Sequence, residues 1–294
     1  EKKSDIKNYK LSELIYWFKT PQKYWLNKNN ISPKEIFIHH PDEEYVSNLQ
    51  KSQLITKIIQ QVEIDNHNII DDLNELNIND QLAENGIIMP KNSIFTKEKE
   101  IKDLLSSLSA SLSQHNKINK IYVKLNANKE EYLIADDTVI ELINAKLSLS
   151  RLTEAWIKLL FISSLKRNIK RTKVIFRTEN NYKSQIIQSP GATESNLILE
   201  EYINIFKNYS EKCLPLPPES SYKYVEAKIK SKNEKKAFTD KWIGNKNFSK
   251  GERDNIEMKM CFGNEKEPDF FLGNNNFDQL SYRLYGPLIK ALKK

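Results

Sequence analysis

Lysine and arginine are concentrated in one short stretch of the chain, SLKRNIKRTKVIFR, at residues 164–177. Its basic side chains are Lys166, Arg167, Lys170, Arg171, Lys173 and Arg177. A lysine or arginine that contacts a phosphate releases bound counterions, which gives nucleic-acid binding its salt dependence. We therefore expect this cluster to bind DNA, although a run of charge can also be a solvated surface. A second basic run, 222–242, adds Lys228, Lys230, Lys232, Lys235 and Lys236.

Histidine and cysteine give weaker signals for metal chemistry. His39 and His40 precede acidic residues in HHPDEE, but adjacent side chains on an extended segment point to opposite faces and do not easily share one ion. Cys213 and Cys261 are the only cysteines, and their spacing is not that of a zinc site. We expect inert thiols and no metal site. The chain has only seven glycines and none of the phosphate-binding glycine fingerprints.

The composition bounds the class of protein. The chain has 294 residues, with 39% hydrophobic and 29% charged residues, so we expect a packed core. Its formal net charge of +7 favours an acidic partner, nucleic acid first and an anionic membrane second. No run approaches the length that spans a membrane. The chain opens with EKKSD and no methionine, and we expect a fragment of a longer, cytoplasmic protein.

Aromatic residues gather close to the start, in LSELIYWFKTPQKYWLN at 11–27. The apolar residues that follow the spacing of an amphipathic helix are Leu11, Leu14, Ile15 and Phe18. Thr20 and Pro21 suit the N-cap and first position of a second helix. We expect Trp17 and Trp25 to be buried as an aromatic wedge. The alternative is a platform on which the bases of a single strand stack.

The hydrophobic period changes along the chain and divides it into elements. We expect helices at 1–30, 47–84, 96–114, 149–165, 192–212, 222–248 and 277–294, a β-meander at 120–148 and a strand at 170–179. The order of three strands, a helix and a strand resembles the heart of the restriction-endonuclease-like (PD-(D/E)xK nuclease-like) fold. The expected class is α/β (α+β) with a mixed β-sheet, a helical front part over 1–118, and the nuclease-like core plus added C-terminal helices over 119–294.

Several motifs, in order, resemble one family. The opening stretch fits L-x-x-L-x-x-F/W-x-x-x-P-x-x-x-F/W, and PDEE follows it. The later motifs are NGIIMPKNS at 85–93, EAWIKLLFISSL at 154–165, the block at 237–263 with KWIG and KGERD, and YGPLIKAL at 285–292. Together they resemble the C-terminal domain of the gamma chain (RecC) of exodeoxyribonuclease V.

The resemblance implies a role. A domain of this family would be a non-catalytic scaffold and DNA strand guide in duplex unwinding and in double-strand-break repair by homologous recombination. Its partners would be duplex ends, the separated single strands and the beta (RecB) and alpha (RecD) subunits of a bacterial, cytoplasmic heterotrimer. It would hold no cofactor, since ATP and Mg²⁺ would be used by the partner subunits.

Active nucleases of this fold carry an Asp on one strand and D/E-x-K on the next, and these side chains hold Mg²⁺ over one phosphate. The resemblance places Ala135 at the first position and Asn144 and Lys146 at the second. Glu154 and Lys158 stand where active relatives carry Q-x-x-x-Y. We therefore expect a degenerate site with no catalytic residue.

Two alternatives stay open. One is an active, metal-dependent stand-alone nuclease of the same fold, whose site would use Asp137, Glu141 and Lys146. The other is a protein–protein interaction module without DNA contact.

Overall fold

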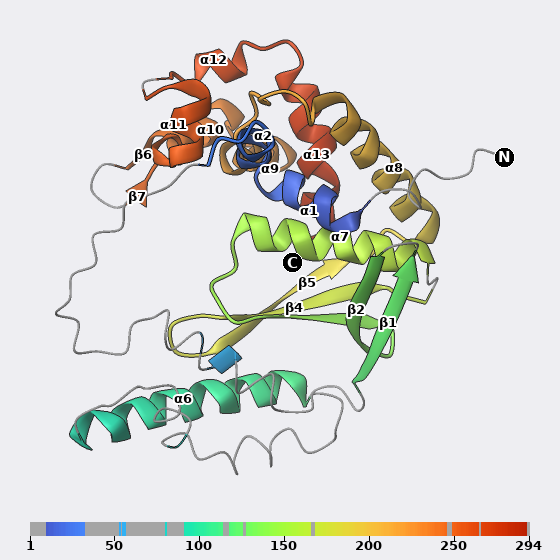
Figure 1. The fold of residues 1–294 in the computed structure, drawn as a ribbon, viewed down its shortest axis with the longest axis vertical. Helices are drawn as coiled ribbons and strands as arrows, with labels where there is room; N and C mark the ends of the chain where they lie inside the picture. The colour runs from blue at the N-terminus through green and yellow to red at the C-terminus, as the bar shows by residue number, and fades with distance from the viewer. Residues whose placement is uncertain are drawn as a thin grey trace.

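The computed structural model describes residues 10–32, 53, 55–56, 80, 91–113, 118–125, 128–165, 168–245, 249–264 and 266–292 (Figure 1). The loop predicted around His39 and His40 lies outside the described residues, as does nearly all of the helical region predicted at 47–84.

A five-stranded mixed sheet lies at the centre of the fold (Figure 1). Its strands, in spatial as in chain order, are β1 (Asn119–Leu125), β2 (Asn128–Ala135), β3 (Thr138–Ile143), β4 (Arg171–Arg177) and β5 (Tyr182–Gln188). Neighbouring strands are antiparallel except β3 and β4, which are parallel. Parallel strands need a crossover connection, and helix α7 (Leu149–Leu165) supplies it. The predicted α/β class with a mixed sheet is confirmed.

The two faces of the sheet are buried in two separate apolar clusters. Along β3 and β4, Val139 and Val174 belong to the cluster beneath α7, while Ile140 and Ile175 belong to the cluster beneath α6 (Lys91–Leu112). This alternation follows from the period of two of a strand. Any side chain on these strands can therefore be assigned to the α7 face or the α6 face.

The remaining helices gather on the α7 side of the sheet (Figure 1). They are α1 (Leu11–Lys19), α2 (Pro21–Lys28), α8 (Ala192–Tyr209), α9 (Pro218–Ile229), α10 (Glu234–Ile243), the 3₁₀ turn η2 (Glu252–Asp254), α11 (Ile256–Phe262), α12 (Asp269–Leu272) and α13 (Phe277–Ala291). A short two-stranded sheet pairs β6 (Gly244–Asn245) with β7 (Ser249–Lys250). Helices α1 and α7 share one apolar cluster, and the expected division of the chain at residue 118 stays a prediction.

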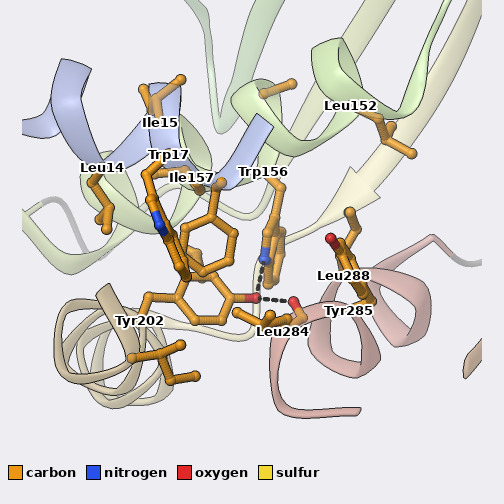
Figure 2. Packing of buried hydrophobic residues seen from close by; sticks show 14 of the residues in the cluster. Leu14, Ile15, Trp17, Leu152, Trp156, Ile157, Tyr202, Leu284, Tyr285 and Leu288 are labelled. Atoms are coloured by element: carbon orange, nitrogen blue, oxygen red, sulfur yellow. Dashed lines mark hydrogen bonds between the residues drawn. The ribbon is translucent and has the colours of Figure 1, made fainter. Parts of the chain in front are cut away.

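A buried hydrogen-bond chain ties three helices together (Figure 2). The indole N–H of Trp156 on α7 donates to the hydroxyl of Tyr202 on α8 at 3.1 Å, and this hydroxyl donates to the carbonyl oxygen of Leu284 on α13 at 2.9 Å. Each buried polar tip of this aromatic pair thus has a partner, as burial requires.

The aromatic opening stretch is largely core. Trp17 is 1% exposed, and its ring meets Phe206 edge-on with centroids 5.7 Å apart. Trp25, by contrast, is only partly buried. Pro21 opens α2 as predicted, but the side chain of Thr20 makes no capping bond and instead donates to the carbonyl oxygen of Tyr16. The burial of Trp17 favours the wedge over a base-stacking platform.

Several predicted boundaries differ from the structure. Strand β5 was not expected, because YKSQIIQ lacks a clean alternation of apolar and polar residues. The helical region predicted at 222–248 is two helices, since Ser231 adopts a left-handed conformation with φ 53° between α9 and α10. Helix α9 also begins inside the proline-rich segment, with Pro218 in its first turn.

Candidate functional site

The residues expected to mark a degenerate nuclease site lie on both faces of the sheet. Ala135, at the end of β2, is buried in the α6-face cluster. Asn144, just after β3, accepts a hydrogen bond from the hydroxyl of Tyr182, which belongs to the same cluster. Glu154 and Lys158 lie on α7, across the sheet from them. The structure therefore brings Glu154 and Lys158 together but does not bring Ala135 or Asn144 to them.

Lys146 lies at the surface. Its ammonium group is 3.0 Å from Oε1 of Glu179, and the two side chains are 77% and 79% exposed. An ion pair this exposed adds little stability. Within the described residues, Lys146 therefore belongs to an exposed ion pair and not to a buried site.

Asp137 lies in the two-residue turn between β2 and β3, at the opposite end of β3 from Lys146. Its carboxylate is 3.2 Å from the ammonium of Lys170 and accepts a hydrogen bond from the Thr138 hydroxyl at 3.0 Å. These hydrogen bonds, from Lys170 first, lower the pKa of Asp137. The described residues contain no group of three or more His, Cys, Asp or Glu side chains that could hold a metal ion.

A half-buried network of charges connects α1, α7 and β3. The ammonium of Lys158 is 2.7 Å from Oε1 of Glu141 on β3 and 3.2 Å from Oε1 of Glu154, one turn earlier on α7. The other oxygen of Glu154 accepts from Lys19, at the end of α1, at 2.7 Å. Glu141 lies on the α7 face because it is two residues from Val139. The order of charges is Lys19, Glu154, Lys158, Glu141.

The network favours the charged forms of Lys158 and Glu154. Burial acts to lower the pKa of Lys158, but the charge and hydrogen bond of Glu141, and then those of Glu154, outweigh burial and raise this pKa. Burial acts to raise the pKa of Glu154, yet the hydrogen bond from Lys19 and the charge of Lys158 lower it overall. Both carboxylate–ammonium contacts of Lys158 are therefore charge-assisted hydrogen bonds.

The described members of the first basic cluster do not form one continuous surface. Lys170 and Arg171 are exposed and lie around Asp137, and Arg171 also donates to the hydroxyl of Thr138 at 2.9 Å. Arg177 lies at the far end of β4. Lys166 and Arg167 lie outside the described residues.

Lys173 is buried rather than exposed. It is 7% accessible, and its ammonium donates to the carbonyl oxygen of Ser111 at 3.0 Å, in the last turn of α6. A cation suits the C-terminal end of a helix, where carbonyl groups lack helical partners. Burial, followed by the charge of Arg171, lowers the pKa of Lys173. In this structure Lys173 docks α6 onto the sheet.

The second basic run is divided between ion pairs and exposed lysines. Lys228 pairs with Asp278 at 2.5 Å, and Lys230 pairs with Glu226 at 2.7 Å. The exposed lysines around the start of α10 are Lys232, Lys235 and Lys236.

The GERD segment of the closing block, residues 251–254, has a structural role. Glu252 is buried, and its carboxylate accepts hydrogen bonds from the backbone N–H of Glu219 at 2.9 Å and from the N–H and hydroxyl of Ser220 at 2.6 Å each, in the first turn of α9. Burial raises the pKa of Glu252 to about 7, although these hydrogen bonds oppose the rise. A side chain at Gly251 would lie 2.3 Å from the carbonyl oxygens of Trp242 and Ile243. This motif is therefore explained by packing.

Comparison with known proteins gives the family. The model of the family described as RecC C-terminal domain matches residues 6–229, well over half of the chain. The chain belongs to this family. A search of curated proteins found no match. The RecC match includes α1, the five strands of the central sheet, α7 and α8, and it ends with α9. The charge network therefore lies inside the match and the GERD segment beyond it.

No helix in the described part of the chain is both long and apolar enough to cross a membrane.

Proposed function

We propose that this chain is the non-catalytic C-terminal domain of the gamma subunit of exodeoxyribonuclease V and serves there as a scaffold and DNA strand guide. Membership of the RecC C-terminal domain family implies a role in the multi-subunit RecBCD complex. The finer role is duplex unwinding during double-strand-break repair by homologous recombination. The scaffold docks the RecB and RecD subunits, which use ATP and Mg²⁺, while this domain itself uses no cofactor.

We propose that its core is restriction-endonuclease-like. Support comes from the order of β1, β2, β3, α7 and β4, in which an antiparallel meander is followed by a crossover helix and a strand parallel to β3. Helices cover both faces of this sheet (Figure 1). Such a core, without its chemistry, is a rigid surface on which other subunits and DNA can be placed.

One observation carries the proposal that the domain is non-catalytic. Glu141 and Glu154 converge, but they converge on the ammonium of Lys158. Metal-dependent hydrolysis of a phosphodiester needs carboxylates that are free to hold a cation and a water. The alternative acid, Asp137, is bound by Lys170 at the other end of β3 from Lys146.

The experiment is a nuclease assay on the purified chain. Linear duplex DNA incubated with the chain and either MgCl₂ or MnCl₂ should stay intact, because the converging carboxylates are already occupied by an ammonium group. A Glu141→Gln variant prepared in parallel reports any contaminating nuclease. Digestion by the parent chain that disappears in this variant would establish the stand-alone nuclease instead.

A second function is favoured by a different observation. Several basic side chains that could meet phosphate are already engaged within the chain, notably Lys173, Lys228 and Lys230. This favours an interaction module without DNA contact. The two functions differ in salt dependence, because phosphate contacts release counterions and a protein-only module would show no such effect.

A further inference from the structure

The two carboxylates around Lys158 form an arrangement that needs a cation. Oxygens of Glu141 and Glu154 lie within 2.7 and 3.2 Å of one point, the Nζ atom of Lys158. Like charges held this close in a partly desolvated place repel each other strongly unless a positive charge lies between them. Carboxylate oxygens that converge on one point are also the ligands that hard divalent cations prefer.

We propose that the Lys158 ammonium is a built-in cation, which fills a carboxylate pair that would otherwise hold a divalent metal ion. The inference rests on the proposed non-catalytic function and identifies the residue that keeps metal out. In the described part of the chain, Lys158 is the cationic group on which a carboxylate of α7 and one of β3 converge. The same part contains no group of three or more His, Cys, Asp or Glu side chains that could hold a metal ion. Without the Lys158 ammonium, Glu141 and Glu154 would bind a hard divalent cation.

Charge balance around the site supports this assignment. The network contains two ammonium groups, from Lys19 and Lys158, and two carboxylates, from Glu141 and Glu154. The side chains of Lys158 and Glu141 are each 22% exposed, and that of Glu154 is 28% exposed. Because Lys19 reaches only the outer oxygen of Glu154, removing Lys158 takes away the cation that faces Glu141 and gives the site a net negative charge.

The coordination preferences of the two ions indicate which of them would fit with least movement. Calcium binds carboxylate oxygens at about 2.3–2.6 Å in a flexible geometry, whereas magnesium requires about 2.0–2.1 Å in a near-ideal octahedron. Because the two carboxylates come from different elements, β3 and α7, the less strict geometry of calcium suits them better than the octahedron of magnesium. The remaining exposure of the two carboxylates leaves room for water to complete the coordination of the ion.

The test replaces Lys158 with serine, which opens space and removes the charge. The Lys158→Ser variant should bind CaCl₂ in calorimetry, and at about 100 times Kd the bound ion should raise Tm by roughly 5–10 °C. MgCl₂ should give a smaller shift. The parent chain and a Lys158→Arg variant, which keeps the cation, should show no calcium-dependent shift. The double variant Lys158→Ser with Glu141→Gln should lose the response.

The proposal fails if the folded Lys158→Ser variant shows no calcium response, or if the parent chain binds calcium equally well through Glu141. In either case the network is a structural ion pair only. If the serine variant is unfolded without metal, a CaCl₂ titration followed by circular dichroism decides. Recovery of helical signal supports the proposal, and its absence at saturating calcium overturns it.

The test separates this proposal from the proposed function. It uses neither DNA nor a nuclease readout. If the Lys158→Ser variant does not bind calcium, the proposal about Lys158 is wrong, but the proposed scaffold role is unaffected. Digestion of duplex by the parent chain would overturn the non-catalytic function, whatever the serine variant binds.

Discussion

Individual charged side chains that are buried or half-buried hold several elements of this molecule together. Lys158, Lys173 and Glu252 are ordinary surface residue types, yet each is wholly or largely removed from water and bonded to a partner far away in the chain. A buried charge is tolerated only where a partner offsets the loss of hydration. At this scale, charge that looked available for DNA or metal is instead used to hold elements together.

Glu252 gives a pH prediction. Its folded-state pKa of about 7 lies above the ordinary value of 4.5, so the folded state holds this proton more tightly than the unfolded state. Its contribution to stability is full below about pH 4.5 and is lost as pH rises through 7, by about 3 kcal/mol in total. Urea unfolding at pH 5 and pH 8 should show this loss in the parent chain and not in Glu252→Gln. An equal pH dependence in both proteins would contradict the assignment. Glu267→Gln, at an exposed position, controls for the lost charge.

At the scale of elements, helices are fixed to the sheet by a few polar contacts added to apolar packing. Helix α7 is joined to β3 by Lys158 and to α1 by Glu154, while α6 is joined to β4 by Lys173. The backbone N–H of Ser220, in the first turn of α9, donates a hydrogen bond to the carboxylate of Glu252. The apolar clusters supply most of the stability, and these polar contacts add directional bonds between particular positions of neighbouring elements.

Lys173→Met should loosen the docking of α6. Methionine keeps the apolar stem but cannot donate to Ser111, and a hydrogen bond from a charged group contributes about 1.5–3 kcal/mol. Hydrogen exchange in the last turns of α6 should become faster, while exchange in α7 stays unchanged. Lys170→Met, at an exposed position just before β4, is the matched control. Unchanged protection of α6 in Lys173→Met would show that the apolar cluster alone holds the helix.

At the scale of the whole molecule, the family and the distribution of charge point to an assembly component. The sheet is covered by helices on both faces (Figure 1), so DNA and other subunits can meet only its edges, its turns and the outer surfaces of the helices. Lys170 and Arg171 lie at the start of β4, beside the turn between β2 and β3. A strand guide has to pass every sequence, and phosphate contacts provide binding without base discrimination.

Neutralising Lys166, Arg167, Lys170 and Arg171 to glutamine should weaken DNA binding about equally for any sequence. The slope of log affinity against log salt should flatten by about 0.9 for each duplex phosphate that the variant no longer neutralises. Fluorescence anisotropy over a salt series measures both quantities. A variant with Lys232, Lys235 and Lys236 neutralised is the comparison, because these lysines are exposed around α10. An unchanged slope in the first variant and a flatter one in the second would move the guide to α10.

The sequence by itself determined several of the local elements and the family. Period-two apolar residues predicted the meander, α7 has the predicted bounds of 149–165, and the proline at position 21 marks the start of α2. These features depend on neighbours within a few residues, which a sequence displays directly. The ordered motifs pointed to the RecC C-terminal domain, and the family match agrees.

Only the tertiary structure decided which charges meet. Lys158 finds Glu141 across 17 positions, Lys19 finds Glu154 across 135, and Lys173 finds Ser111 across 62. Side chains that are adjacent in a strand, such as Ile140 and Glu141, are assigned to opposite faces only once the sheet and its covering helices are in place. Burial and long-range pairing therefore set the chemistry of these lysines, and neither property is written in the spacing of residues along the chain.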